Sequence, residues 1–186
     1  CLSFHPRKLL TTGEGGACLT DDEELAEALR ALRNHGQRDG RFAVAAGNHR
    51  MTEMAAAMGL AQLDRLDEIV ARRRALAERY RERLPAEWVQ RPARAGVESN
   101  AQTFGILVPD RDATIAALRA DDIEAGRLSF ALDRIESLED RFRAGSASFE
   151  NAHRIEDRGV ALPLHPQLDR ASQDHVIESL LRVIDP

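Results

Sequence analysis

Residues 1–16 read CLSFHPRKLLTTGEGG and combine a short apolar start, one lysine and a glycine-rich turn. Lys8 is the only lysine of the 186-residue chain, and the other 25 cationic side chains are arginines. An amine can lose its proton and condense with an aldehyde, whereas a guanidinium stays protonated in proteins. The segment therefore marks Lys8 as a candidate for covalent chemistry, with a plain surface lysine as the alternative.

The sequence around this segment predicts short strands followed by a helix. Residues 1–4 read as a buried strand and residues 17–20 as a second short strand. A helix is expected from residue 21 or 22 to about Asn34, because aspartate suits its cap and acidic residues fill its first turn. Residues 36–50 show no clear periodicity and are expected to form a loop.

The rest of the chain predicts a long helix and then an α+β pattern. Thr52 can cap a helix whose first residues are small. Apolar residues then recur at helical spacing from about Leu60 to Leu84, and this short, interrupted stripe favours a helix between two lobes over an isolated coiled coil. Residues 85–100 read as a linker or edge strand. Further strands and helices are expected at 102–108, 112–120, 123–128, 148–157, 160–164 and 172–184. The fold class that follows is α/β.

The composition is that of an ordinary soluble globular protein and excludes several classes of function. Hydrophobic residues make up 43% and charged residues 31% of the chain, as in typical folded domains. The net charge of -5 gives no basic surface for nucleic acid or an anionic membrane, and no apolar run approaches the roughly 20 residues of a bilayer span. Cys1, Cys18 and the histidines lack the spacing of a metal site or a disulfide framework. We therefore expect a cytoplasmic protein without a metal.

Three segments, in this order, carry a family resemblance. The first is Ser3-Phe4-x-x-x-Lys8 followed by Thr12-Gly13-Glu14-Gly15-Gly16. The second runs from Leu32-Arg33-Asn34-His35-Gly36 through Asn48-x-Arg50 to Gly59-Leu60-Ala61-Gln62-Leu63. The third is Leu162-Pro163-Leu164-His165-Pro166. Together they resemble the DegT/StrS-type sugar aminotransferases, which are pyridoxal-phosphate enzymes of fold type I. The resemblance covers most of the chain, thins between about 125 and 158, and matches only the C-terminal half of such an enzyme.

The resemblance implies a partial fold-type I aminotransferase. Residues 1–60 would be the C-terminal part of the large cofactor-binding lobe, residues 61–84 the connecting helix, and residues 85–186 a small α+β lobe. The chain opens without methionine inside an apparent strand, so the N-terminal half of a longer protein is expected to be absent. The first lobe is then expected to expose apolar surface where the absent strands belong.

The resemblance also assigns roles to four residues. Lys8 aligns with the catalytic lysine that holds pyridoxal 5'-phosphate as a Schiff base, and Ser3 with a serine that donates to the cofactor phosphate. Asn48 aligns with an asparagine that reaches the cofactor of the neighbouring subunit, which implies a homodimer with a shared active site. Arg50 would bind the carboxylate of the amino donor. The alternatives are a backbone-bonded buried serine at Ser3 and a loop ion pair at Arg50.

The implied reaction moves an amino group from glutamate or glutamine to a keto sugar, often nucleotide-linked. Gly47 and His49 stand where the family has aromatic residues, and residues 124–130 lack its basic-aromatic stretch, so the sugar is not carried over. No residue matches the family's contacts to the pyridine nitrogen, to the ring face or to the phosphate turn. This chain alone is therefore expected to be inactive. Two alternatives stay open: a catalytically incomplete remnant acting as a dimerisation or regulatory module, and a lyase on the same scaffold.

Overall fold

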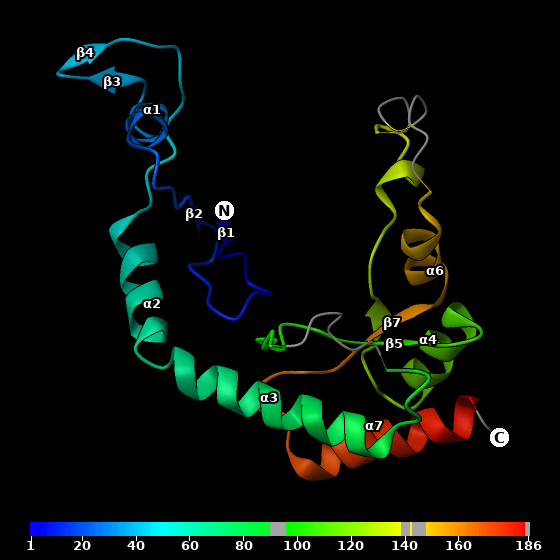
Figure 1. Cartoon of the computed structure of the whole chain (residues 1–186). Coiled ribbons are helices and arrows are strands. Elements are labelled where there is room, and N and C mark those ends of the chain that lie inside the picture. The colour runs from blue at the N-terminus through cyan, green and yellow to red at the C-terminus, as the bar shows by residue number, and fades with distance from the viewer. Residues whose placement is uncertain (90–95, 139–141, 143–147, 185–186) are drawn as a thin grey trace. The chain divides into compact units, whose positions relative to one another are not determined.

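The computed structural model describes residues 1–89, 96–138, 142 and 148–184 (Figure 1). The chain divides into two compact units, residues 1–69 and residues 70–186. Helix α3 (Leu66–Arg83) crosses the boundary between them. The expected linker or edge strand at 85–100 falls partly outside the described residues; within them, Val89 forms an isolated bridge with Ile106.

Unit 1 opens with a short antiparallel strand pair. Strand β1 (Leu2–Ser3) pairs with β2 (Gly16–Ala17), and the loop between them carries Lys8. The prediction of a buried strand over residues 1–4 is wrong, because β1 has only two residues and Leu2 is 51% exposed. No third strand joins this pair among the described residues, so its apolar side chains stay uncovered.

Helix α1 (Glu23–Arg33) forms as predicted, and local chemistry fixes both of its ends. The Asp22 side chain accepts a hydrogen bond of 3.0 Å from the Leu25 N–H, which caps the helix. At the other end, the Gly36 N–H donates to the Ala31 carbonyl at 2.8 Å, and Gly36 has φ +75°. A Cβ atom at Gly36 would lie 1.8 Å from the Val44 carbonyl oxygen, so only glycine fits there.

The segment after α1 is a hairpin, which corrects the expectation of a plain loop over residues 36–50. Strand β3 (Gln37–Arg38) pairs antiparallel with β4 (Arg41–Phe42). The connecting residues Asp39 and Gly40 have φ of 47° and 75°, as a tight two-residue hairpin turn requires.

The helix expected to begin at Thr52 forms, but the stretch expected to be helical from Leu60 to Leu84 is divided between two helices. Helix α2 (Glu53–Leu63) begins after Thr52, whose hydroxyl accepts from the Ala55 N–H at 3.2 Å. The helical ladder then changes at residues 64 and 65, where the Arg65 N–H donates to the Gln62 carbonyl at 3.0 Å in a tighter turn. Helix α3 starts at Leu66, directly after this turn.

Unit 2 contains a three-stranded antiparallel sheet of order β5-β7-β6. The strands are β5 (Phe104–Leu107), β6 (Gly126–Arg127) and β7 (Gly159–Leu162), with Phe104 opposite Leu162. The remaining elements are helices α4 (Arg111–Ala120), α6 (Glu150–Arg158) and α7 (Arg170–Ile184), and the 3-10 turn η1 (Leu132–Arg134). These positions confirm the α+β pattern predicted for this part of the chain.

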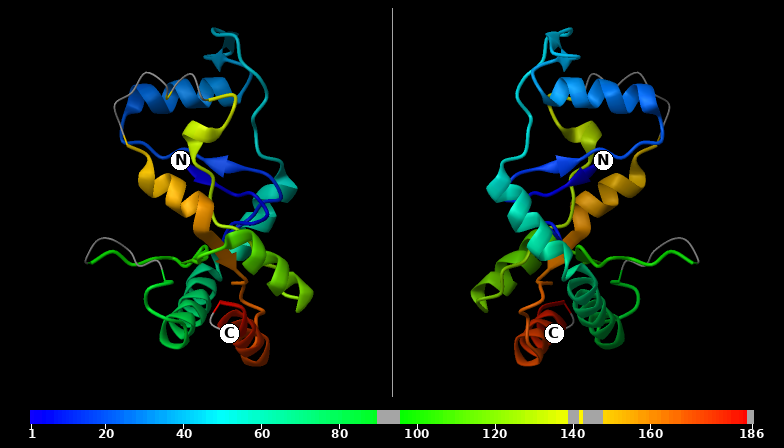
Figure 2. Two further views of the ribbon diagram at one scale, coloured as in Figure 1. Left: turned by 90° about the vertical axis from the view of Figure 1, so that its right-hand side faces the viewer. Right: turned by 90° about the vertical axis from the view of Figure 1, so that its left-hand side faces the viewer.

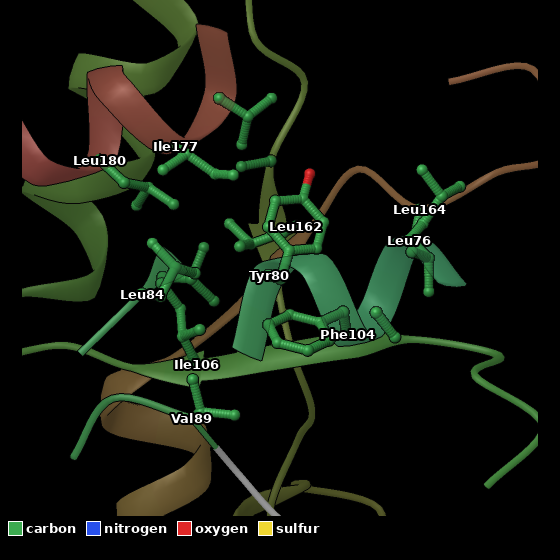
Figure 3. Packing of buried hydrophobic residues seen from close by; sticks show 14 of the residues in the cluster. Leu76, Tyr80, Leu84, Val89, Phe104, Ile106, Leu162, Leu164, Ile177 and Leu180 are labelled. Atoms are coloured by element: carbon green, nitrogen blue, oxygen red, sulfur yellow. The ribbon is translucent and has the colours of Figure 1, made fainter. Parts of the chain in front are cut away.

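The hydrophobic core of the described residues lies in unit 2. Tyr80 of α3 packs on Phe104 of β5 with ring centroids 5.0 Å apart, and its hydroxyl donates to the Pro163 carbonyl at 3.0 Å (Figure 3). Within this unit α3 and α7 run side by side (Figure 2), and the buried Gln173 side chain donates to the Leu76 carbonyl at 2.8 Å. The core thus packs residues of α3, α4 and α7 against residues of β5 and β7.

Unit 1, in contrast, leaves large apolar side chains exposed, as expected. Of the 14 large hydrophobic residues that are exposed in the described chain, 11 lie in residues 1–69. Met54 is 83% exposed, and Leu19 and Phe42 are each 74% exposed. No helix among the described residues has the length and apolar character needed to cross a membrane.

Candidate active site

Lys8 lies in the loop between β1 and β2, in unit 1. Its backbone N–H donates to the His5 carbonyl at 2.9 Å, which forms a turn around Pro6 and Arg7. The side chain is exposed, and within the described part of the chain its ε-amine makes no hydrogen bond or ion pair. The loop therefore presents the only lysine of the protein with its amine unengaged.

Backbone hydrogen bonds close the base of this loop. The Phe4 N–H donates to the Gly15 carbonyl at 2.9 Å, and the Phe4 carbonyl accepts from the Thr12 N–H at 3.1 Å. The Thr11 hydroxyl donates to the same carbonyl at 2.9 Å. The two arms on either side of Lys8 are thus held together at Phe4.

The glycines after Lys8 shape the turn of the loop. Gly13 has φ +82°, a conformation that favours glycine. A Cβ atom at Gly15 would lie 2.4 Å from the Thr12 hydroxyl oxygen, so the turn has no room for a side chain there. The carbonyl of Glu14 accepts from this hydroxyl at 2.9 Å, while the Glu14 side chain is exposed, so Glu14 acts here as a turn residue.

Helix α2 anchors the loop through Gln62, a residue that the sequence analysis did not assign to the site. The Gln62 side chain accepts from the Thr11 N–H at 3.1 Å and donates to the Thr11 carbonyl at 2.7 Å. Thr12, which is only 5% exposed, lies beside Gly59 of the same helix. A glutamine in a helix carries no sequence signal for such a contact, because 51 residues separate it from its partner.

Ser3 sits at the entrance of the same loop. Its hydroxyl oxygen accepts a long hydrogen bond of 3.4 Å from the His5 N–H, and the residue is exposed. A hydroxyl that only accepts can still donate its hydrogen to an anion. The alternative of a buried serine does not hold. Ser3 ends strand β1, and Lys8 lies in the loop that follows this strand.

Asn48 and Arg50 form a second group, beside the end of α1. The His35 N–H donates to the Gly47 carbonyl and the His49 N–H to the Arg33 carbonyl, both at 2.9 Å. The Asn48 side-chain oxygen accepts from the Arg50 backbone at 3.3 Å and from its guanidinium at 3.1 Å. Among the described residues, no hydrogen bond connects this pair with Ser3 or Lys8.

The two departures from the family pattern, Gly47 and His49, fit each other. A Cβ atom at Gly47 would lie 2.9 Å from the His49 ring, so the imidazole occupies the space that a side chain at position 47 would need. In this conformation the exposed His49 ring lies over Gly47, and a side chain at position 47 would require the imidazole to move.

Arg50 also lines a hollow of about 620 Å³ in unit 1 that is rich in arginine. Four guanidinium groups and two carboxylates border it: Arg30, Arg33, Arg38, Arg50, Glu27 and Asp39. Arg30 is already paired with Glu27. The excess of positive charge suits an anionic group. No cluster of three potential metal ligands occurs in the described ranges.

The chain matches the family model described as the DegT/DnrJ/EryC1/StrS aminotransferase family over residues 1–181. It is 32% identical to dTDP-3-amino-3,4,6-trideoxy-alpha-D-glucose transaminase of Micromonospora megalomicea subsp. nigra, covering 98% of this chain and 51% of that protein. It is 44% identical over 85 residues to GDP-perosamine synthase of Caulobacter vibrioides, covering 44% of this chain and 23% of that protein.

The fold agrees with this match. The structure of S. venezuelae DesV in complex with a ketimine intermediate superposes with a TM-score of 0.88 at 28% identity, covering 99% of this chain and 51% of that one. This chain therefore spans about half the length of the relatives that it matches from end to end. The prediction of an α/β fold that corresponds to part of a fold-type I aminotransferase is confirmed. The lysine loop, the sheet of unit 2 and the match over residues 1–181 show that the chain belongs to the DegT/DnrJ/EryC1/StrS aminotransferase family.

Proposed function

We propose that this chain supplies the lysine-bearing part of an aminotransferase that moves an amino group from glutamate or glutamine to a nucleotide-linked keto sugar. The observation that carries the proposal is the presentation of Lys8, a sole lysine on a loop fixed to helix α2, whose amine none of the described residues engages. The family uses pyridoxal 5'-phosphate. The names of two relatives, which contain GDP and dTDP, support a nucleotide-linked sugar.

Two residues of unit 1, Lys8 and Ser3, carry groups that could hold this cofactor. The Lys8 Nζ atom, in its neutral form, can add to the cofactor aldehyde with loss of water, and the Ser3 hydroxyl can donate to the phosphate. When bound, the cofactor supplies an electron sink that makes the α-proton of the amino donor labile. Lys8, once displaced by the donor, is placed to accept that proton at Nζ and to return it.

We propose that Asn48 and Arg50 act across the interface of a homodimer. Because the Asn48 oxygen is engaged by Arg50, its amide hydrogens remain available to donate to the cofactor phosphate in the partner subunit. Arg50 would bind the carboxylate of the amino donor, for which the arginine-rich hollow provides a favourable potential. In this arrangement each active site needs Lys8 of one subunit and Asn48 of the other.

The experiment that tests the proposal is a half-reaction. The protein is loaded with pyridoxal phosphate, freed of excess cofactor and mixed with glutamate, and 2-oxoglutarate is measured. A transferase gives up to one equivalent of 2-oxoglutarate per Lys8, and Lys8→Ala gives none. A Lys8-dependent elimination product without 2-oxoglutarate would identify a lyase instead. No Lys8-dependent product in a chain that binds the cofactor would support the expectation that this chain alone is inactive.

A second candidate function is a dimerisation module without catalysis, which the exposed apolar surface of unit 1 favours. On helix α2, Met54 is 83% and Leu60 64% exposed, more than an isolated helix face in water normally leaves uncovered. Sedimentation measurements with Met54→Gln and Leu60→Gln test it. Loss of self-association without any Lys8-dependent cofactor binding in the unmodified chain would favour the module over the enzyme.

A further inference from the structure

The Gln62 side-chain amide pairs with the Thr11 backbone through two hydrogen bonds, as two backbone amides pair between neighbouring β-strands. One side-chain amide faces one backbone amide, accepting at 3.1 Å and donating at 2.7 Å. A single hydrogen bond fixes a distance, but two antiparallel bonds also fix an orientation. The backbone of Thr11, three positions after Lys8, is therefore held at a set angle to helix α2.

Other contacts fix both partners of this pair. The Gln62 amide nitrogen also lies 3.1 Å from the Met58 carbonyl one turn earlier, which restrains its rotamer. Thr12 is buried, and its methyl group occupies the space left open by Gly59, where a Cβ atom would come within 2.9 Å of it. Both sides of the contact are thus ordered by neighbours in unit 1.

The restraint reaches both arms of the Lys8 loop. The Thr11 hydroxyl and the Thr12 N–H both donate to the Phe4 carbonyl, at 2.9 and 3.1 Å. Phe4 precedes Lys8 by four positions, and Thr11 follows it by three. Since the Lys8 side chain has no partner among the described residues, the position of its amine depends on these two arms.

We propose that Gln62 is a positioning residue for Lys8. Its side-chain amide holds the loop against α2 and so sets the place at which the lysine meets pyridoxal phosphate. The proposal rests on the proposed function for the identity of the bound group. The proposal goes beyond the proposed function because it names Gln62, a residue outside the Lys8 loop, as one on which cofactor binding depends.

Three variants of the 186-residue chain test the proposal. Gln62→Met keeps a side chain of similar length without either hydrogen bond, and Gln62→Glu keeps the acceptor but turns an oxygen toward the Thr11 carbonyl. Gln167→Met makes the same change at an exposed glutamine of unit 2. The first readout is hydrogen exchange at the Thr11 amide. We expect it to be about five- to tenfold faster in Gln62→Met, as the loss of one net hydrogen bond predicts, and unchanged in Gln167→Met.

The second readout separates positioning from simple stabilisation. It is the pyridoxal phosphate concentration that gives half-maximal borohydride-stable labelling of Lys8, mapped by peptide mass well below the thermal midpoint. We expect this concentration to rise about tenfold in Gln62→Met, as the loss of about 1.4 kcal/mol would give, and to rise also in Gln62→Glu. Circular dichroism should be unchanged in both. If one Gln62 variant fails to fold, the other carries the test.

Two results would overturn the proposal, and they differ in whether the proposed function also fails. Faster exchange at Thr11 with an unchanged labelling concentration would show that Gln62 only stabilises the loop, and the proposed function would stand. The other result needs a reference in which the lysine is moved to an exposed position of unit 2, by Lys8→Arg combined with Arg119→Lys. If Lys8 of the unmodified chain is labelled no more readily than the moved lysine, the proposed function fails and the positioning role falls with it.

Discussion

Thr12 and Gly59 show how a single methyl group can set the distance between the Lys8 loop and helix α2. Thr12 is buried, and its hydroxyl is tied to the Glu14 carbonyl at 2.9 Å, so it cannot turn away freely. An added Cβ atom at Gly59 would approach the Thr12 methyl carbon to 2.9 Å, closer than real contacts of this kind. The glycine therefore permits the close approach at the expense of helix propensity.

This contact predicts a coupling between two substitutions. Gly59→Ala should gain up to about 1 kcal/mol of helix propensity but lose it again to the contact with Thr12. Thr12→Ser removes the methyl group and keeps the hydroxyl. In a double-mutant cycle by urea unfolding, we expect Gly59→Ala to be more favourable in the Thr12→Ser background by about 1 kcal/mol. Additive free energies of unfolding would show that the two residues do not limit each other.

Tyr80 provides a second test on a single residue, in the core of unit 2. Its ring is fully buried, and burial raises the pKa of the Tyr80 hydroxyl, which stays protonated and donates to the Pro163 carbonyl at 3.0 Å. Tyr80→Phe leaves that carbonyl without its donor and should lower the free energy of unfolding by about 1–2 kcal/mol. Ser129→Ala, which removes an exposed hydroxyl, serves as the control. Equal stability of Tyr80→Phe and the parent chain would contradict the role of this bond.

The sequence could mark Lys8 and Ser3 as candidate site residues because their spacing within one short segment matches a family motif. It could not identify Gln62, whose partner Thr11 is distant in the chain and is contacted through the backbone rather than through a recognisable side chain. Residue patterns also do not show that the His49 imidazole lies over Gly47, which is a contact of the folded loop. Contacts that arise only after folding are the part of the site that residue patterns do not contain.

At the level of secondary-structure elements, ion pairs link helices α3 and α7 and make the stability of unit 2 depend on pH. Asp174 of α7 accepts hydrogen bonds from Arg79 at 2.5 Å and Arg83 at 3.2 Å, both on α3. The hydrogen bond from Arg79 is the main reason that the pKa of Asp174 lies below its usual value. The pKa of Asp157 is lowered in the same way by Arg134, on the other side of unit 2.

These shifts predict that unit 2 loses stability in acid. A carboxylate whose pKa is lower in the folded state stabilises the fold above its unfolded pKa of about 3.9, and this stabilisation is lost as the pH falls through the folded pKa. The thermal midpoint should therefore be nearly constant from about pH 8 to pH 5 and fall below about pH 4. Asp174→Asn should lower the midpoint at neutral pH and reduce its fall in acid. An identical acid profile for the variant would rule out a contribution from this aspartate.

Most helices and strands could be predicted because their signals are local, and the exceptions have physical causes. Helix α1 was predicted from Asp22 and the acidic first turn that follow a short strand. The β3–β4 hairpin was missed because its strands have two residues each and show no alternation, although Asp39-Gly40 is a favoured turn pair. The stretch from Leu60 to Leu84 is divided between two helices, because the spacing of apolar residues alone does not reveal the turn at residues 64 and 65.

At the level of the whole molecule, apolar burial is distributed unevenly. The buried cluster consists of residues from 76 to 180, whereas most exposed large apolar side chains belong to residues 1–69. Because burial of apolar surface is the main source of folding free energy, unit 2 should be the more stable of the two.

Hydrogen exchange measured by mass spectrometry tests this distribution. Amides of β5, β7 and α7, such as those of Ile106, Val160 and Ile177, should exchange only through global unfolding of unit 2. Amides of α1 and α2 should exchange faster by at least about tenfold, because less buried surface opposes their opening. Equal protection of the two units would mean that unit 1 is stabilised by something other than its own buried residues.

The central claim is that the fold gives Lys8 a reactivity toward pyridoxal phosphate that an ordinary exposed lysine lacks. The most direct measurement is peptide mapping after borohydride reduction, over a range of cofactor concentrations, for the unmodified chain and for the variant that combines Lys8→Arg with Arg119→Lys. We predict that the Lys8 peptide is labelled at concentrations at least about tenfold lower than the peptide that carries the moved lysine. Equal labelling of the two peptides would contradict the account, because Lys8 would then be a surface lysine like any other.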